Sequence, residues 1–257
     1  MKSERVLIVA GAIFSFACAV NFSWAQEAEI PPVQYPVLPA QSADANGFVP
    51  EGWLIDTRSE GDLNKDGLAD LLLVLRDNDP TNVLKNDSFG PPELNTNPRM
   101  IAVAFAGGEG KPYLLVLQNH TLIPRHEQST LDDAFDNTTA PTIARGAFSI
   151  SLGLFANAGG WDMSNATLTF RYQNGRFELI GFEESTVRRN TGAMTTTSAN
   201  FSTGKVRLDT GNIENDKTRT VWKTLPRKAL LSIDEVGNGL DYYPLPQRPK
   251  GVDADPG

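Results

Sequence analysis

The sequence predicts a mostly β protein: an antiparallel sheet folded as a sandwich or open barrel, in a single domain with flexible ends. Three observations predict this class. Large apolar residues recur at every second position over Arg99–Phe105 (Ile101, Val103 and Phe105) and over Ala147–Phe155, which is typical of half-buried strands. Asn174-Gly175 separates two further alternating runs, which is typical of a hairpin. The sequence shows no long amphipathic helical pattern.

The first residues have the pattern of an export signal. Lys2 and Arg5 precede the apolar run Val6–Val20, and Ser23-Trp24-Ala25 places small residues at positions −3 and −1 of a cleavage site. The run is shorter than the ~20 apolar residues that a membrane span needs. We therefore expect a signal peptide over residues 1–25 and a bacterial protein, periplasmic or secreted, with no membrane span after cleavage.

Cysteine usage and charge limit the compartment and the partners. Cys18 is the only cysteine, so cleavage after Ala25 leaves a mature chain without disulfides, and a lipoprotein acylated at Cys18 is the alternative. The formal net charge is −8, and clusters of Lys or Arg along the sequence are missing. Both features argue against nucleic acid and against an anionic membrane surface as partners.

Proline-rich ends flank the expected domain. Residues 26–51 hold five prolines and are predicted to form an extended linker, with a segment lying along the domain surface as the alternative. The β-rich domain is expected over 52–237. Residues 238–257 are rich in Pro and Gly, and the part from Leu240 onward is expected to be a disordered tail.

Further strands are expected in chain order. Leu68–Leu75 is a continuous apolar run after a turn, which predicts a buried strand, and Tyr113–Gln118 is a second apolar run. The polar, Thr-rich stretch 191–203 separates these from three more expected strands. These are Lys205–Asp209, Arg219–Thr224 and Ala229–Val236.

The hairpin over Ala166–Phe182 has a predicted register. Asn174-Gly175 supplies the two residues with positive φ that a type I′ turn requires. A two-residue loop then pairs Tyr172 with Phe177, and Phe170 with Leu179. Both pairs place apolar side chains on one face, as cross-strand packing favours.

The most informative stretch is Gly61–Leu75, with the sequence GDLNKDGLADLLLVL. Its oxygen-bearing side chains alternate, Gly67 allows a sharp turn, and an apolar strand follows. Such an arrangement suits Ca²⁺, which takes six to eight oxygen ligands. The expected ligands are the side chains of Asp62, Asn64, Asp66 and Asp70 and the backbone carbonyl of Leu68. The alternative is an Asx-rich turn without an ion.

This stretch resembles the Asp-rich loop of FG-GAP and VCBS-type repeats, here present as a single copy. The resemblance implies that the loop binds Ca²⁺ and leads into a strand. A wider resemblance spans Gly61–Val206 and includes LLVLQNHTLIP and TFRYQNGRFELIGFE. It is to a group of exported bacterial proteins of unknown function, and it implies a shared fold but no activity.

Catalytic patterns are few, and we predict no catalytic residues. His120 and His126 flank a proline and are expected to be exposed loop residues. Asp132-Asp133 and Glu183-Glu184 are neighbours that point to opposite faces of a strand. Trp161 follows two glycines and is expected to cover an open edge of the core, with stacking on a sugar or contact with a partner as the alternative.

The sequence therefore favours an exported, non-enzymatic binding or structural module with one structural Ca²⁺ and an unknown protein or glycan partner. Two alternatives remain. One is a periplasmic hydrolase that uses a carboxylate pair drawn from the two acidic dipeptides. The other is a carbohydrate or surface-adhesion module that binds through Trp161.

Overall fold

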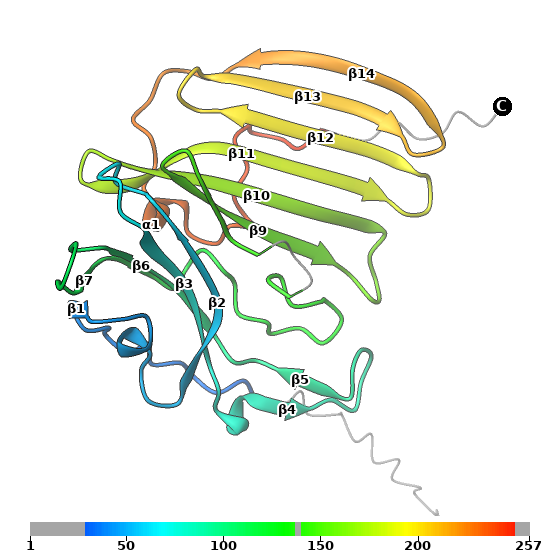
Figure 1. Ribbon diagram of the computed structural model, residues 1–257. Coiled ribbons are helices and arrows are strands. Elements are labelled where there is room, and N and C mark those ends of the chain that lie inside the picture. The colour runs from blue at the N-terminus through cyan, green and yellow to red at the C-terminus, as the bar shows by residue number, and fades with distance from the viewer. Residues whose placement is uncertain (1–28, 137–139, 250–257) are drawn as a thin grey trace, which may run out of the picture.

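Two antiparallel sheets face each other and confirm the mostly β class (Figure 1). The computed structural model describes residues 29–136 and 140–249. The expected signal peptide over residues 1–25 lies outside the described residues.

The smaller sheet has five strands. Their order is β1 (Gln41–Ser42), β7 (Tyr113–Asn119), β6 (Arg99–Phe105), β3 (Asp70–Asp77) and β2 (Trp53–Gly61). The apolar run predicted over Leu68–Leu75 thus forms β3, which begins at Asp70. β3 lies between β6 and β2, so it is a central strand.

The larger sheet has seven strands and curls into a half-barrel (Figure 1). It is a meander whose neighbours follow chain order. The strands are β8 (Thr142–Ala144), β9 (Ala147–Phe155), β10 (Asp162–Gln173), β11 (Arg176–Arg188), β12 (Ala193–Asn200), β13 (Lys205–Asn212) and β14 (Asn215–Thr224). The remaining elements are the strand pair β4 (Val83–Lys85) and β5 (Glu93–Asn95), two 3₁₀ turns η1 (Asn46–Phe48) and η2 (Pro80–Asn82), and α1 (Ile233–Val236).

The continuous apolar sequence of β3 is explained by burial on both faces. Leu72 and Val74 pack in the main core, which the smaller sheet shares with the larger sheet. Leu71, Leu73 and Leu75 point the other way, into a second core beneath the N-terminal segment. A strand covered on both sides has no polar face, so its sequence does not alternate.

The N-terminal segment closes this second core. Leu38 and Phe48 are buried in it, and β1 pairs with β7. The prediction of an extended linker is therefore wrong for residues 29–51, and the alternative of a segment that lies along the domain surface is correct for this part. Its apolar residues are too widely spaced among prolines to form a periodic pattern.

The C-terminal segment also packs against the domain. Leu240, Tyr242 and Tyr243 lie against the main core, and the Tyr243 hydroxyl is 2.7 Å from that of Thr197. Burial raises the pKa of Tyr242 to about 12. The expected disordered tail is therefore wrong for residues 240–249, where aromatic side chains supply apolar surface despite the prolines.

Two local expectations in the second half of the chain are also wrong. The Thr-rich stretch contains β12, whose Thr195 and Thr197 are buried and whose alternation of small residues escapes a hydrophobic pattern. Ala229–Val236 is not a strand. Its end forms the short helix α1, because Ser232 and Glu235 make a capping box.

No described helix is long or apolar enough to cross a membrane, since α1 has four residues.

The predicted register of the hairpin is confirmed from Phe170 to Leu179, and beyond it a β-bulge shifts the register by one residue, so that Thr169 pairs with Gly181. Gln173 pairs with Arg176, Tyr172 with Phe177 and Phe170 with Leu179. Asn174 and Gly175 have φ of 54° and 75°, as a type I′ turn requires. The resulting aromatic and aliphatic face lies in the main core.

The turn yields a stability prediction. Gly175→Val is expected to lower the free energy of unfolding by roughly 1–3 kcal/mol, because a β-branched residue is strained at positive φ. No atom lies within 4 Å of a Cβ at this position, so the cost arises from the backbone and not from a clash. Urea denaturation measures it. Gly181→Ala is the control, because its nearest neighbour would be at 3.5 Å, an ordinary contact. An unchanged midpoint for Gly175→Val contradicts the turn assignment.

Candidate metal site

The Asp-rich loop connects β2 to β3 and is held against its neighbours at both ends. Gly61 precedes it, and a Cβ there would lie 2.7 Å from the side chain of Ile143 in β8, so only glycine permits this approach. Inside the loop, Leu63 is buried in the main core. Farther along, the side chain of Lys65 passes close to Gly146 in the turn between β8 and β9. The loop is therefore placed where the two sheets meet.

Asp62 folds the first half of the loop. One carboxylate oxygen accepts a hydrogen bond from the backbone N–H of Lys65 at 2.6 Å, and the other accepts one from that of Gly67 at 3.0 Å. Lys65 and Gly67 both have positive φ, of 71° and 87°. Gly67 thus makes the sharp turn that its position in the sequence predicts.

Asn64 and Asp66 fold the second half. The side-chain oxygen of Asn64 accepts from the Asp66 N–H, and Asp66 Oδ1 accepts from the Leu68 N–H. The Asn64 amide also donates to Asp66 Oδ2 at 2.9 Å. Asp66 is exposed and Asn64 is half-buried. The hydrogen bonds are those of successive Asx turns.

Asp70 differs from the other four expected ligands because it is fully buried, with 0% of its surface exposed. Its Oδ2 accepts from the N–H of Leu63 at 2.8 Å, and its Oδ1 accepts from that of Ala106 at 2.9 Å. The carboxylate therefore links the start of the loop, the start of β3 and the turn after β6.

Burial raises the pKa of Asp70, and the nearby charge of Asp66 raises it further, while the N–H groups of Ala106 and Leu63 lower it. The net direction is upward. A cation next to these two carboxylates would favour their ionised forms. A nearby positive charge would therefore stabilise the ionised carboxylates of the loop.

The atoms that the five expected ligands offer are of the type that a hard cation binds. They offer only oxygen atoms, and a carboxylate has about four lone-pair positions, so the turn hydrogen bonds leave acceptor capacity on Asp62 and Asp66. In the described part of the chain, no three His, Cys, Asp or Glu side chains already converge as a metal cage. An ion held here would draw together the side-chain oxygens of Asp62, Asn64, Asp66 and Asp70 and the carbonyl oxygen of Leu68.

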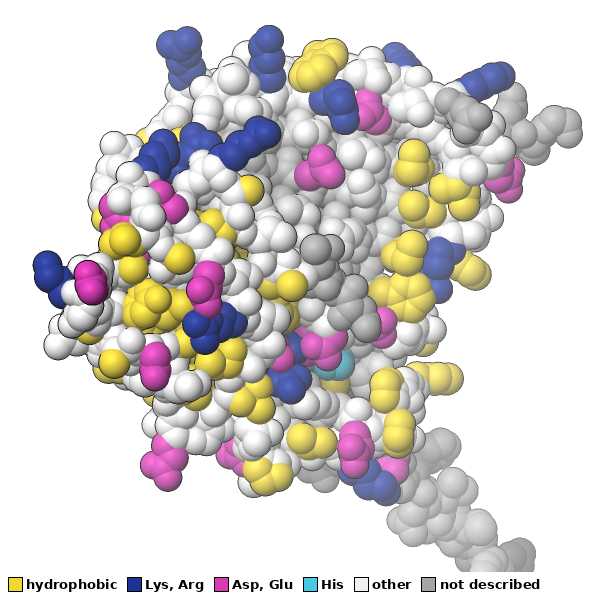
Figure 2. Space-filling model, in the orientation of Figure 1, with side chains coloured by type: hydrophobic (Ala, Val, Ile, Leu, Met, Phe, Trp, Pro, Cys, Tyr) yellow, Lys and Arg dark blue, Asp and Glu magenta, His cyan; other side chains and the backbone are white. Residues whose placement is uncertain are grey.

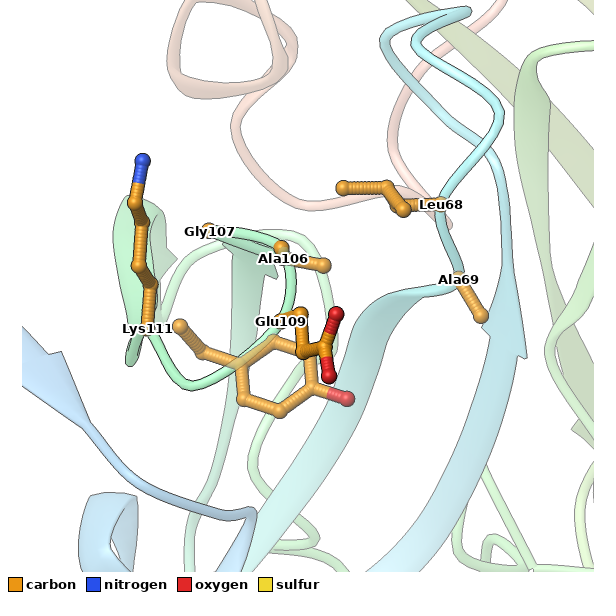
Figure 3. A pocket seen from close by; sticks show the side chains of 8 residues that line it. Leu68, Ala69, Ala106, Gly107, Glu109 and Lys111 are labelled. Carbon is orange, nitrogen blue, oxygen red and sulfur yellow. The ribbon is translucent and has the colours of Figure 1, made fainter.

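A shallow pocket of about 360 Å³ lies beside the loop (Figure 3). Leu68 and Ala69 form one side, and the turn from Ala106 to Lys111 forms the other. In Figure 3, Leu68 points across this space toward the Ala106–Gly107 backbone. The pocket adds one carboxylate, Glu109, which sequence reasoning did not connect with the loop because it belongs to a different turn.

The two histidines lie in the loop after β7 and line a second pocket, of about 680 Å³. His120 is exposed, as predicted, and its ring stacks on Tyr35 at 4.2 Å. His126 is half-buried, and its Nε2 lies 2.8 Å from the carbonyl oxygen of Leu131. Each histidine therefore has a structural contact.

The acidic dipeptides make separate contacts. Asp133 pairs with Arg99, and Asp132 accepts from Asn157. Glu184 is buried in β11 and pairs with Arg248, whereas Glu183 is exposed. These partners lie in different parts of the fold, and the arrangement gives no support to a catalytic pair.

Trp161 does not cover the core. Its side chain is 63% exposed, so that prediction is wrong, and the alternative of a contact with a glycan or partner remains.

A buried charge cluster was missed by sequence reasoning. Arg99 is 3% exposed and contacts Asp56 at 2.6 Å, Asp133 at 2.7 Å and Asp136 at 2.5 Å. Burial lowers the pKa of Arg99, but Asp133 and Asp56 more than offset this, so the pKa is raised. Its guanidinium also lies over the ring of Phe135, 5.3 Å from the ring centre. The cluster ties β6 to the strand β2 and to the 133–136 loop.

Comparisons with protein-family models, with curated proteins and with solved structures found no match to this chain.

Proposed function

We propose that this protein is an exported, non-enzymatic binding or structural module whose fold is stabilised by one Ca²⁺ in the Asp62–Asp70 loop. The observation that carries the proposal is the way the loop is held: the half-buried Asp62 and Asn64 and the exposed Asp66 share one loop with a buried Asp70 that hydrogen-bonds two separate backbone segments. Export is inferred from the signal pattern over residues 1–25.

This geometry favours a structural role for the ion. Leu63 is inside the loop and also inside the main core, and Asp70 begins the central strand β3. Ordering the loop therefore fixes the start of β3 and its contact with the turn after β6. An ion that binds only the folded chain stabilises it by mass action.

The separate partners of the acidic dipeptides favour a module over a hydrolase. A glycosidase pair needs two carboxyl groups about 5–10 Å apart across a cleft. Here Asp133 is neutralised by the buried Arg99, and Glu184 is paired with Arg248. A second candidate function, attachment to a glycan or a protein through Trp161, is favoured by the exposure of that side chain.

Calcium titration of an Asp66 variant tests the proposal. Asp66→Ala is expected to abolish Ca²⁺ binding in calorimetry while circular dichroism shows the same fold, since Asp66 is exposed and contacts only its own loop. Wild type should bind with a dissociation constant on the order of 0.1–1 mM, as extracellular calcium modules do.

Asp87→Ala is the matched control, because Asp87 is an exposed loop carboxylate that pairs only with Lys85 in the described contacts. It should leave Ca²⁺ binding unchanged. Equal Ca²⁺ binding by wild type and Asp66→Ala would show that the ion binds elsewhere, and would contradict the assignment of the Ca²⁺ site to this loop.

A further inference from the structure

The last strand of the larger sheet, β14, has one free edge among the described residues. β14 pairs with β13 on one side, and no described strand pairs with its other side. It is ten residues long and lies at the top of Figure 1, on the far side of the larger sheet from the smaller one. Unpaired backbone N–H and C=O groups on such an edge can accept another strand.

The two faces of β14 carry different side chains. Lys217, Arg219, Val221 and Lys223 share one face, because they alternate along the strand. Trp222 lies on the opposite face, across from Arg207 in β13. Every described side chain of β14 is exposed, with Trp222 at 63%.

The charge of this region is opposite to that of the whole chain. Residues 205–228 hold seven Lys and Arg but three Asp and Glu, a net charge of +4. The rest of the chain therefore carries −12, since the whole carries −8. Figure 2 shows Lys and Arg side chains along the top of the molecule, where Figure 1 places β13 and β14.

The cations of β14 are not used inside the fold. Lys217, Arg219 and Lys223 form no ion pair with another described side chain, whereas Arg207 in β13 pairs with Asp209 at 2.9 Å. Three cations spaced at two- and four-residue intervals along one strand face match carboxylates at the same spacing on an adjacent strand.

We propose that the free edge of β14 binds an extended acidic segment of a partner protein by strand addition. Backbone hydrogen bonds to the edge would supply affinity, and alternate Asp or Glu side chains facing Lys217, Arg219 and Lys223 would supply selectivity. This inference deepens the proposed binding role by naming its surface and the chemistry of its partner. A second copy of the chain is disfavoured, because pairing two β14 strands brings like charges together.

Charges on an edge strand also deter aggregation, and that role would be enough to explain the lysines and the arginine of β14. It does not explain Trp222 or the exposed Val221, since apolar side chains make a free edge more prone to association. A docking edge accounts for both, because a bound strand would cover the apolar groups while its carboxylates pair with the cations.

Fluorescence polarisation with a labelled synthetic peptide tests the proposal. The probe is about ten residues long and alternates glutamate with valine, matching the length of β14. The full-length mature protein should bind it, and binding should weaken as salt rises. Two control peptides separate the contributions. One has its backbone N-methylated at alternate residues, and the other has lysine in place of glutamate; neither should bind.

Paired variants locate the site. Lys217→Glu together with Arg219→Glu should weaken binding about tenfold or more, because two attractive cross-strand pairs become repulsive. Lys111→Glu is the matched control, since Lys111 is an exposed cation in the turn between β6 and β7 and should leave affinity unchanged. Circular dichroism of both proteins confirms that the fold persists.

Several outcomes overturn the proposal. Equal binding of the N-methylated peptide would show that charge alone attracts the probe. Stronger binding of single-stranded DNA or anionic vesicles than of the peptide would assign the cations to another class of partner. Peptide binding is measured with chelator and with Ca²⁺, so a loop that binds no ion leaves this test intact.

Discussion

Arg99→Met is expected to lower the free energy of unfolding by about 3–5 kcal/mol, the cost of removing one partner from a buried charge cluster. The guanidinium contacts three carboxylates, those of Asp56, Asp133 and Asp136, and lies over Phe135. Methionine fills part of the volume but leaves the three carboxylates to repel one another. Urea denaturation at neutral pH measures the loss.

The loss should depend on pH in a definite direction. In wild type, burial and the charge of Asp133 already raise the pKa of Asp136, although Arg99 opposes the rise. Without Arg99 the pKa of Asp136 rises further above its value in the unfolded chain. The variant therefore recovers stability as pH falls and Asp136 becomes protonated, and it loses that stability as pH rises.

Arg58→Met is the control for this variant. Arg58 pairs with Glu60 on the exposed part of β2, where an ion pair contributes about 0–1 kcal/mol. A destabilisation of Arg99→Met no larger than that of Arg58→Met would contradict the role assigned to the cluster.

Asp70→Ala is expected to cost about 2–4 kcal/mol even without Ca²⁺, because it leaves the N–H groups of Leu63 and Ala106 without their carboxylate acceptor. Denaturation in chelator isolates this effect. Asp66→Ala is the matched comparison in the same loop and should cost far less there, since Asp66 is exposed. Equal losses in the two variants would contradict the structural role of Asp70.

The same carboxyl predicts a pH effect in chelator. Burial raises the pKa of the Asp70 carboxyl, so protonation of this group favours the folded chain at low pH. This pH-dependent stabilisation declines as pH rises through the folded-state pKa. Asp70→Ala should remove that decline. Ca²⁺ should oppose the decline in wild type, because it favours the ionised carboxyl.

Features set by short-range chemistry were predictable from the sequence. The register of the hairpin next to its turn follows from Asn174-Gly175, because only particular backbone angles close a two-residue turn. The β-bulge between Thr169 and Phe170, which shifts the outer part by one residue, was not predicted. The strands β6 and β9 have the predicted bounds, and in β9 alternation sets which side chains face the core. The expectation that β6 is half-buried is wrong, because Met100, Ala102 and Ala104 on its other face lie in the second core. The turn of the Asp-rich loop likewise follows from Gly67.

Features set by distant residues were not predictable in the same way. The carboxylates around Arg99 are 34 to 43 residues away along the chain, and no local pattern joins them. The Pro-rich ends pack because other segments of the chain form apolar surfaces for them. Phe48 of the N-terminal segment lies in the second core, and Tyr243 of the C-terminal segment packs against the main core. β12 was not predicted because its inward-facing residues are Ala and Thr, which are too weakly hydrophobic to give a recognisable alternating pattern.

Thermal melting of the wild-type protein in chelator and in several millimolar Ca²⁺ tests the central claim most directly. Several millimolar Ca²⁺ is about 5- to 50-fold above a dissociation constant of 0.1–1 mM, so an ion that binds only the folded state adds about 1–2.3 kcal/mol. For a domain of this size that raises Tm by roughly 2–9 °C. Mg²⁺ should substitute poorly, since it requires shorter bonds in a rigid octahedron. Identical melting curves in chelator and Ca²⁺ would show that Asp62–Asp70 is only an Asx-rich turn, and would contradict the account.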